Sequence, residues 1–410
     1  MARVLLLLPT TTYKTPDFLA AARKLGVDVT VASEEPSAVE ALNPDGLLAL
    51  PFRDPAAAAR GAVEFAAKRP FEAVVGVDEE TTVAAAVIAR ALGLPSNPVH
   101  AAVAARHKPT MRELLARAAV PSPAHRVFDR RADPGEASRQ VRFPCVLKPA
   151  FLAASRGVIR ANDRKEFVAA WRRIGGILDS PDVAARGGDA AAEILVEDYV
   201  AGREVALEGL LRDGELEVLA LFDKPDPLEG PYFEETIYVT PSRLPEEMQQ
   251  RIAQVASRGA LAIGLREGPV HAELRIDREG PWLIEIAARS IGGLCSRALR
   301  FGTGMSLEEV ILRHALRMEM PEAERERKAA GVMMLPIPRG GILEEVRGLD
   351  RARTVAAIED VAITIPIGRR VVPLPEGSRY LGFLFSRADT PQRAEAALRE
   401  AHALLQFQIV

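Results

Sequence analysis

The stretch HAELRIDREGPWLIEIAARSIGG, residues 271–293, says more about the fold of this chain than any other. Two mainly apolar runs, residues 271–276 and 282–288, flank five residues that favour a turn. Short runs separated by such a turn predict a β-hairpin. We therefore expect an antiparallel pair of strands here, with the turn centred on Glu279.

Two carboxylates face each other in this hairpin. A turn centred on Glu279 places Glu273 opposite Glu285, and like charges directly opposite destabilise a ladder. Magnesium is one solution, because it typically takes one or two carboxylates plus substrate phosphates. The alternative is a salt bridge from Glu273 to Arg275 or Arg289 on a solvated face. The apolar neighbours of Glu285 weigh against that alternative, because an unpaired buried carboxylate is costly.

Two further stretches carry groups that bind anions. Arg289 precedes the paired glycines 292–293, and arginine grips a carboxylate or phosphate bidentately while glycine lets backbone approach. Lys148 ends an apolar strand, and the small residues in 153–158 could donate backbone N–H groups to phosphates. A salt bridge from Arg289 to the hairpin carboxylates and a solvated lysine at a strand end are the alternatives.

A linker between two strands is a candidate nucleotide site. An apolar strand runs into residues 197–200, and a second strand begins near Gly202. Backbone groups of such a linker can bind an adenine ring, and Glu204 can accept hydrogen bonds from ribose hydroxyls. A hairpin turn at residues 213–214 would place Glu204 opposite Asp223. The alternative is an exposed acidic edge.

The first hundred residues alternate short apolar strands with helical stretches, which predicts a parallel sheet with crossover helices. The expected strands are 4–8, 27–32, 46–50 and 73–77, and the expected helices are 16–25, 55–68 and 79–92. Ligands gather at the carboxyl ends of such strands, here residues 9–13 and 78–81. No Gly-x-Gly-x-x-Gly follows the first strand, which disfavours a dinucleotide site.

The remaining chain is mixed in character. We expect a helix at 109–118, strands at 331–336 and 361–367, a final helix at 391–404, and a mobile excursion at 180–192.

Composition limits the classes of protein. A length of 410 residues suggests two or three domains, and a net charge of −3 gives no reason to expect nucleic acid or an anionic membrane as partner. Cys145 and Cys295 have no second metal ligand at a useful spacing, which fits packing residues in a reducing cytoplasm. The apolar run 4–8 is too short for a membrane span. We expect a soluble cytoplasmic protein.

The order of these motifs resembles the ATP-grasp superfamily, specifically the carboxylate–amine ligases that include bacterial L-amino-acid ligases, with biotin carboxylase as a more distant relative. The resemblance covers nearly the whole chain and implies a multidomain α/β and α+β fold. It implies a Rossmann-like pre-ATP-grasp parallel sheet at 1–108, an ATP-grasp domain of two α+β subdomains at 109–318 with a lid at about 124–200, and a small α+β C-terminal lobe at 319–410.

The resemblance also assigns roles to residues. It implies that Lys108, Lys148, Ser155, Gly157, Glu197, Asp198, Val200 and Glu204 bind the nucleotide, that Glu273 and Glu285 hold the metal, and that Arg289 and Lys148 act in catalysis. Arg289 matches the arginine that holds the acyl phosphate. Ala287 departs from the family, since many members have asparagine there, and this puts a second metal in doubt.

The implied activity is ATP-dependent activation of a carboxylate and its joining to an amine, with ATP and Mg²⁺, or Mn²⁺ in its place, as cofactors. The partners expected are small-molecule carboxylate and amine substrates, and a homodimer stays open. A bicarbonate-activating enzyme and a non-catalytic ATP-binding module are the alternatives. Glu234, Glu235 and Asp223 are candidates for the base that deprotonates the amine. Residues 222–235 are expected to form a substrate-facing loop, in which Tyr232 and Phe233 either line a pocket or pack beneath the loop. A lone histidine such as His271 is more often structural.

Overall fold

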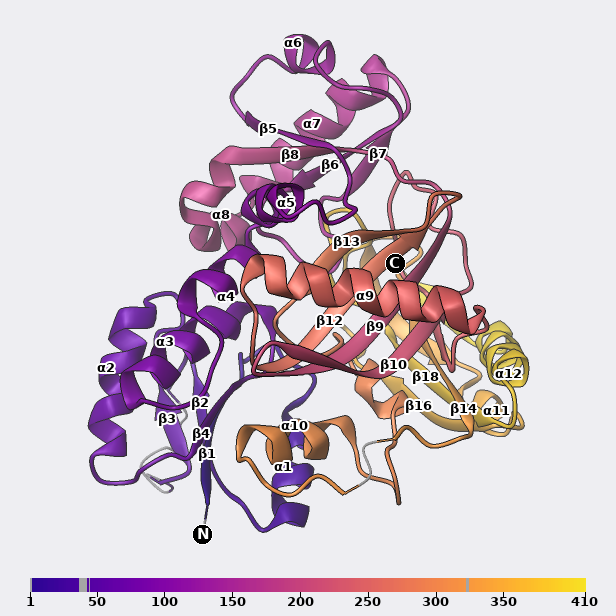
Figure 1. Cartoon of the computed structure of the whole chain (residues 1–410). Coiled ribbons are helices and arrows are strands. Elements are labelled where there is room, and N and C mark those ends of the chain that lie inside the picture. Colours follow the sequence, from indigo (N-terminus) through magenta and orange to yellow (C-terminus); the bar gives the residue numbers. More distant parts are fainter. Residues whose placement is uncertain (1, 37–42, 44, 322–323) are drawn as a thin grey trace.

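The computed structural model describes residues 2–36, 43, 45–321 and 324–410. Three units surround a central sheet: an N-terminal sheet, a lid that stands apart at the top of Figure 1, and a C-terminal lobe. None of the helices described is long and apolar enough to cross a membrane.

The N-terminal unit is the parallel sheet expected from the sequence. Its strand order is β3-β2-β1-β4, and every neighbouring pair is parallel. The strands are β1 (Arg3–Leu7), β2 (Asp28–Ser33), β3 (Leu47–Ala49) and β4 (Ala73–Gly76). Alternate residues of β1 face opposite sides: Leu5 and Leu7 pack toward α2 (Pro55–Ala66) and α3 (Thr82–Leu92), while Val4 and Leu6 pack toward α1 (Thr15–Leu25) and α10 (Leu307–Ala315).

The central sheet has eight strands in the order β13-β12-β9-β10-β11-β14-β18-β16. Its strands are β9 (Arg203–Arg212), β10 (Glu215–Lys224), β11 (Ile237–Thr240), β12 (Gly268–Ile276), β13 (Pro281–Ala287), β14 (Ala329–Leu335), β16 (Ile358–Ile363) and β18 (Gly382–Ala388). Helix α9 (Glu246–Ile263) covers one face of this sheet and lies beside α5 (Lys108–Arg117) (Figure 1). Helix α4 (Val99–Arg106) contributes to the same hydrophobic core. The predicted boundary near residue 318 thus falls between strands of one sheet.

The lid is a four-stranded sheet of order β5-β8-β6-β7. Its strands are β5 (His125–Asp129), β6 (Cys145–Pro149), β7 (Ile159–Ala161) and β8 (Glu193–Asp198), and its helices are α6 (Pro134–Ser138) and α7 (Arg164–Leu178). The segment 180–192, predicted to be a mobile excursion, forms α8 (Pro181–Gly187) and the 3-10 turn η3 (Gly188–Ala192). The apolar side chain of Val183 is buried in the lid core and thereby anchors this segment.

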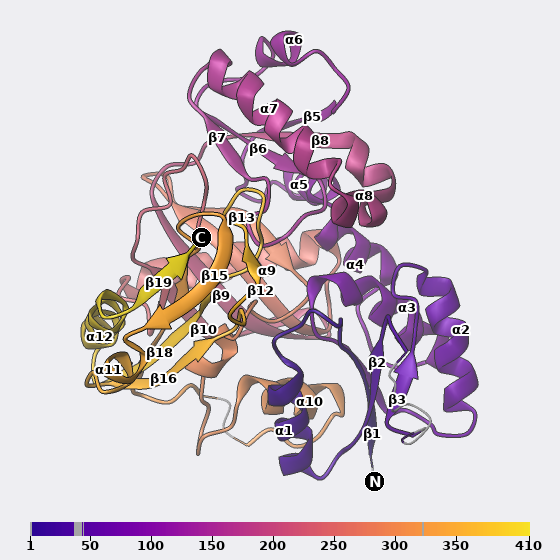
Figure 2. The ribbon, with the colours of Figure 1, turned by 180° about the vertical axis from the view of Figure 1, so that it is seen from behind.

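The C-terminal lobe adds a three-stranded sheet of order β17-β15-β19. Its elements are β15 (Gly341–Arg347), α11 (Leu349–Arg353), β17 (Arg370–Val371), α12 (Pro391–Ala403) and β19 (Gln406–Ile409). Figure 2 shows β19 beside β15.

Two hairpins set the positions of the acidic residues. In the first, a register shift between Val218 and Ala220 pairs Lys224 with Glu204 and Asp223 with Val205. The predicted pairing of Glu204 with Asp223 is therefore wrong, because a β-bulge advances one strand by a residue. In the second, Glu273 does pair with Glu285.

Candidate active site

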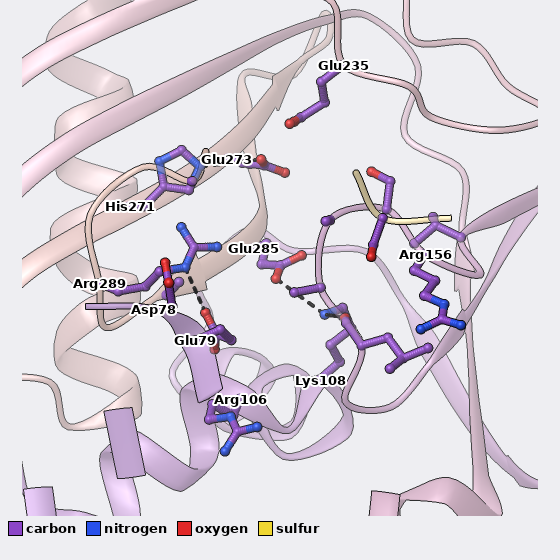
Figure 3. Close-up of a pocket in the computed structure, with 18 of the residues that line it drawn as sticks. Asp78, Glu79, Arg106, Lys108, Arg156, Glu235, His271, Glu273, Glu285 and Arg289 are labelled. Atoms are coloured by element: carbon purple, nitrogen blue, oxygen red, sulfur yellow. Dashed lines mark hydrogen bonds and ion pairs between the residues drawn. The ribbon is translucent and has the colours of Figure 1, made fainter. Parts of the chain in front are cut away.

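A cavity of about 540 Å³ lies where the N-terminal unit, the lid and the central sheet meet. The predicted ligand-binding strand ends of the N-terminal sheet contribute Thr11, Asp78 and Glu79 to its wall. Nearly all the site residues predicted from the sequence line it as well: Lys108, Lys148, Ser155, Glu197, Asp198, Val200, Glu204, Glu273, Glu285 and Arg289. Figure 3 shows ten labelled lining residues around this space.

A β-bulge sets the position of Glu285. Near the turn of the hairpin Leu274 pairs with Leu283, and the extra residue Ile284 restores the pairing of Glu273 with Glu285. Arg112, which is fully buried, donates from Nη2 to the Ile284 carbonyl and from Nη1 to the Leu283 carbonyl at 3.4 Å. The buried guanidinium thereby anchors the irregular backbone that presents Glu285.

Each of the facing carboxylates has its own cation. Lys108 Nζ lies 3.3 Å from Glu285 Oε1, and Lys224 Nζ lies 3.2 Å from Glu273 Oε1 (Figure 3 shows the Lys108 contact). The alternative of a salt bridge from Glu273 to Arg275 or Arg289 is not seen. Arg275 Nε binds Glu204 at 2.8 Å, and Arg289 Nε binds Glu79 at 3.0 Å.

Lys224 sits among three carboxylates. Its Nζ lies 2.8 Å from Glu204 Oε1, contacts Glu235, and is 3% exposed as a side chain. Burial opposes its charge, yet the carboxylates raise the pKa of Lys224 well above its usual value. One oxygen from each of Glu204, Glu235 and Glu273 lies within 4.8 Å of the others, a grouping that can hold a metal ion.

The carboxyl group of Glu235 is a special member of this cluster. Burial raises its pKa to about 7. The negative charge of Glu273 also raises this pKa, whereas the positive charge of Lys224 lowers it. Asp223, another candidate base, accepts hydrogen bonds from Ser242 and Arg243 and does not line the cavity. Of the three predicted candidates, Glu235 alone lines the cavity.

His271 bridges two acidic residues. Its Nδ1 contacts Glu208, and its Nε2 lies 3.4 Å from Glu273. Burial lowers the pKa of this imidazole, but the Glu208 carboxylate outweighs burial and raises it to about 9. The histidine therefore contacts Glu273 as a cation, and its side chain lies at the cavity wall.

The linker after β8 is braced by a buried ion triad. Glu197 accepts from Arg112 Nε at 2.6 Å and lies 2.7 Å from Lys148 Nζ, with only 3% of its side chain exposed. Burial would raise the pKa of Glu197, but the two cations dominate and lower it to about 2. This carboxylate thus holds Lys148 at the cavity.

Backbone groups of the same linker are partly occupied. The Asp198 N–H donates to the Ala124 carbonyl at 2.9 Å, and the Val200 carbonyl accepts from Arg275 Nη1 at 2.7 Å. Within the part of the chain that the structure describes, the Asp198 carbonyl and the Val200 N–H have no protein partner. These are the two groups left to contact an adenine ring.

The loop between β6 and β7, predicted to bind phosphate, uses several of its N–H groups within the protein: the Arg156 N–H donates to the Ala153 carbonyl and the Val158 N–H to the Ser155 carbonyl. Ala154, Ser155 and Gly157 adopt positive φ angles of 56°, 54° and 74°. Ser155 lines the cavity, whereas the Gly157 N–H donates to the Pro375 carbonyl of the C-terminal lobe at 2.9 Å. In this conformation, therefore, the Gly157 N–H is directed away from the predicted phosphate site.

Arg289 connects the central sheet to the N-terminal unit. Its Nε donates to Glu79 at 3.0 Å (Figure 3), and its Nη1 donates to the Ser290 carbonyl at 2.9 Å. Lys14, buried nearby, donates to Ser290 Oγ at 3.2 Å and lies 3.8 Å from Asp78. The loop after β13 is thereby connected to Lys14 at the start of α1 and to Glu79 after β4.

Sequence reasoning missed two residues that organise this site. Lys224 was hidden by the register error, while Arg112 acts through a contact with a residue 85 positions away along the chain. The two aromatic residues of the predicted substrate-facing loop differ in position. Phe233 lines the cavity, whereas Tyr232 packs at the lid, where Arg173 donates to its hydroxyl.

Three family models match successive parts of the chain. They describe an ATP-grasp N-terminal domain at residues 19–96, an ATP-grasp domain at 141–298 and an L-amino acid ligase C-terminal domain at 333–410. The crystal structure of an L-amino acid ligase from Bacillus licheniformis has a TM-score of 0.85 and 27% identity, covering 100% of this chain and 99% of that one.

Curated relatives match over part of their length. Alanine–anticapsin ligase of Bacillus subtilis is 30% identical over 235 residues, which cover 54% of this chain and 49% of the relative. Human carnosine synthase 1 is 31% identical over 273 residues, which cover 63% of this chain and 32% of the relative. The chain thus spans half or less of the length of these two relatives. By its three matched domains and its fold, this chain belongs to the ATP-grasp superfamily.

Proposed function

We propose that this protein is an ATP-dependent ligase that activates a substrate carboxylate as an acyl phosphate and joins it to an amine, releasing ADP and phosphate. One observation carries the proposal: the facing pair Glu273 and Glu285 shares a single cavity with Arg289 and two lysines, Lys108 and Lys148. This is the charge distribution that phosphoryl transfer to a carboxylate needs, since positioning and electrostatics do most of that chemistry.

The donor set suits a divalent cation. Glu273 and Glu285 offer hard oxygen ligands of the kind magnesium prefers, and Mn²⁺ would fit the same set. When bound, the metal would offset the phosphate charge. Ala287 lies on the same wall and offers no ligand atom, so we propose one well-held metal, with Glu204 and Glu235 as the carboxylates grouped with Glu273.

The nucleotide would lie between the lid and the central sheet. We propose that the adenine contacts the Asp198 carbonyl and the Val200 N–H, that Glu204 binds the ribose, and that Lys108, Lys148 and Ser155 bind phosphates. Glu197 acts through Lys148 and Arg112, because its own carboxylate is buried and saturated. Gly157 would contribute only after release from Pro375.

Arg289 would bind the carboxylate substrate and the transferring phosphoryl group. A substrate oxygen attacks the γ-phosphorus, ADP leaves, and the amine then attacks the acyl carbon and expels phosphate. We propose that Glu235 takes the amine proton, because it lines the cavity and burial raises its pKa to about 7. The lid excludes water, which would otherwise hydrolyse the acyl phosphate.

A screen for substrate-dependent phosphate release tests this proposal. Purified protein with Mg-ATP is mixed with pairs of small carboxylates and amines, and we expect phosphate and ADP only when both members are present. Turnover with bicarbonate alone would favour the carboxylase-like alternative. Tight ATP binding with no turnover for any pair would favour a non-catalytic module.

Two further predictions accompany the function. The buried, unpaired thiols Cys145 and Cys295 suit a reducing compartment, so we propose a cytoplasmic location. Sedimentation would test whether the chain forms a homodimer.

A further inference from the structure

The loop after Arg289 leaves open space beside one glycine. Gly292 and Gly293 both line the cavity. A Cβ built on Gly292 meets no heavy atom within 4 Å, and its φ lies outside the left-handed region. Gly293 differs, because its φ is +59° and its Cβ would lie 2.8 Å from the ring of Phe383. A side chain at 292 would therefore occupy cavity space without straining the backbone.

This loop has little freedom to move away from an added side chain. The Ile291 N–H donates to Glu208 Oε2 at 3.0 Å, and Lys14 Nζ donates to Ser290 Oγ at 3.2 Å. Arg289 Nη1 also binds the Ser290 carbonyl at 2.9 Å. Because three contacts fix the backbone next to residue 292, extra atoms there would reduce the volume open to a substrate.

The neighbouring wall is aromatic. Phe383, which underlies Gly293, has its ring centroid 5.8 Å from that of Tyr13 and 6.1 Å from that of Tyr380. Both tyrosines line the cavity, one from the N-terminal unit and one from the C-terminal lobe. Aromatic walls of this kind suit a large uncharged group.

We propose that Gly292 sets the upper size of the side chain on the carboxylate substrate, and that this substrate carries a bulky, uncharged side chain. The inference rests on the proposed ligase function. Gly292 follows Arg289 by three residues on one anchored loop and lines the same cavity, so we place it next to the side chain of the carboxylate substrate that Arg289 would bind. Gly292 acts through its lack of a side chain, as a determinant of specificity.

The test compares wild type with Gly292→Ala and Gly292→Val. Carboxylate substrates are amino acids of increasing size, from glycine to phenylalanine, with glycinamide as an amine that has no free carboxylate. Phosphate release gives kcat/KM for each. We expect Gly292→Val to lower the ratio for phenylalanine over glycine by roughly 10- to 200-fold, and Gly292→Ala by less. A second series varies the amine as amino-acid amides, and its ratios should not change.

Three controls keep the result interpretable. Gly176→Ala makes the same substitution on the exposed face of α7 in the lid, where a Cβ also meets nothing, and should leave every ratio unchanged. Thermal unfolding and ATP binding of the Gly292 variants should match wild type. Gly293→Ala should instead lose stability, because of its positive φ and the Phe383 ring.

The outcomes separate the inference from the function beneath it. If wild type turns over and Gly292→Val keeps the wild-type ratio, or changes only the amide series, the inference is wrong and the ligase function stands. If wild type releases no phosphate with any carboxylate, both are wrong. A wild type that rejects phenylalanine in favour of glycine also overturns the inference.

Discussion

Replacing Glu197 by glutamine should destabilise the lid, because this carboxylate holds two buried cations. Glu197 lies 2.6 Å from Arg112 and 2.7 Å from Lys148. Folding lowers its pKa from an ordinary 4.5 to about 2, which corresponds to about 3 kcal/mol of stability near neutral pH. Glutamine removes this charge and leaves both cations buried, and breaking such an arrangement typically costs about 3–5 kcal/mol.

The assay follows unfolding of the lid itself. Trp171 is buried in the lid core and donates to the Arg130 carbonyl. In a Trp282→Phe background it is the remaining tryptophan of the chain's two, so its fluorescence reports lid unfolding in urea. Glu193→Gln is the matched control, because this residue begins the same strand, is 38% exposed, and pairs with His107 at 3.0 Å. An exposed pair of this kind is worth at most about 1 kcal/mol.

The pH dependence gives a second check on the cause. The folded pKa is below the unfolded one, so the contribution of Glu197 is complete above pH 4.5 and is lost as the pH falls toward 2. The stability difference between wild type and Glu197→Gln should therefore shrink across that window. Equal stability of the two at pH 7, or a cost as large for Glu193→Gln, would refute the reasoning.

Three other predictions concern the metal pair, the lid contact and the thiols. Glu285→Gln should abolish ADP formation, measured by coupled assay, with little change in thermal unfolding, and persistent activity would show the metal assignment to be wrong. Glu376→Gln removes the paired hydrogen bonds from Arg173 at 2.6 and 3.0 Å; we expect faster hydrogen exchange in the lid with less than about 1 kcal/mol lost in urea titration, because the pair is exposed. Burial raises the pKa of Cys145 to about 12 and also raises that of Cys295, so neither thiol should react with a disulfide reagent at pH 8 until the chain is unfolded, and rapid native reaction would contradict their burial.

Matched variants serve as controls for Glu285→Gln and Glu376→Gln. Glu279→Gln changes a carboxylate at the exposed turn of the same hairpin and should leave ADP formation intact. Glu344→Gln alters an exposed hydrogen bond with Gln408, both residues being in the C-terminal lobe, and should not change exchange in the lid.

Local patterns were sufficient for much of the fold. The alternation of strands and helices in the first hundred residues gave the parallel sheet, because each element there is specified by its own neighbours. Helix α9 was not predicted, although Ile252, Val255, Ala256 and Ile263 carry a helical apolar period that was available in the sequence. Strand β18 was likewise missed despite its apolar run.

Register is where sequence reasoning failed. The pairing of Glu273 with Glu285 was predicted from a turn one residue out of place, and the bulge at Ile284 compensated for that error. No second error offset the bulge near Val218, so the predicted partner of Glu204 was wrong and its true partner, Lys224, was missed. Bulges depend on tertiary contacts, such as the hold of Arg112 on Ile284, and no local period encodes them.

The acyl phosphate is the central claim, and oxygen isotope transfer tests it most directly. A carboxylate substrate labelled with ¹⁸O is incubated with the protein, Mg-ATP and the amine, and the released phosphate is analysed by mass spectrometry. If the carboxylate attacks the γ-phosphorus, one labelled oxygen appears in inorganic phosphate and ADP accumulates. Unlabelled phosphate, or AMP with labelled oxygen on its phosphate, would contradict the account.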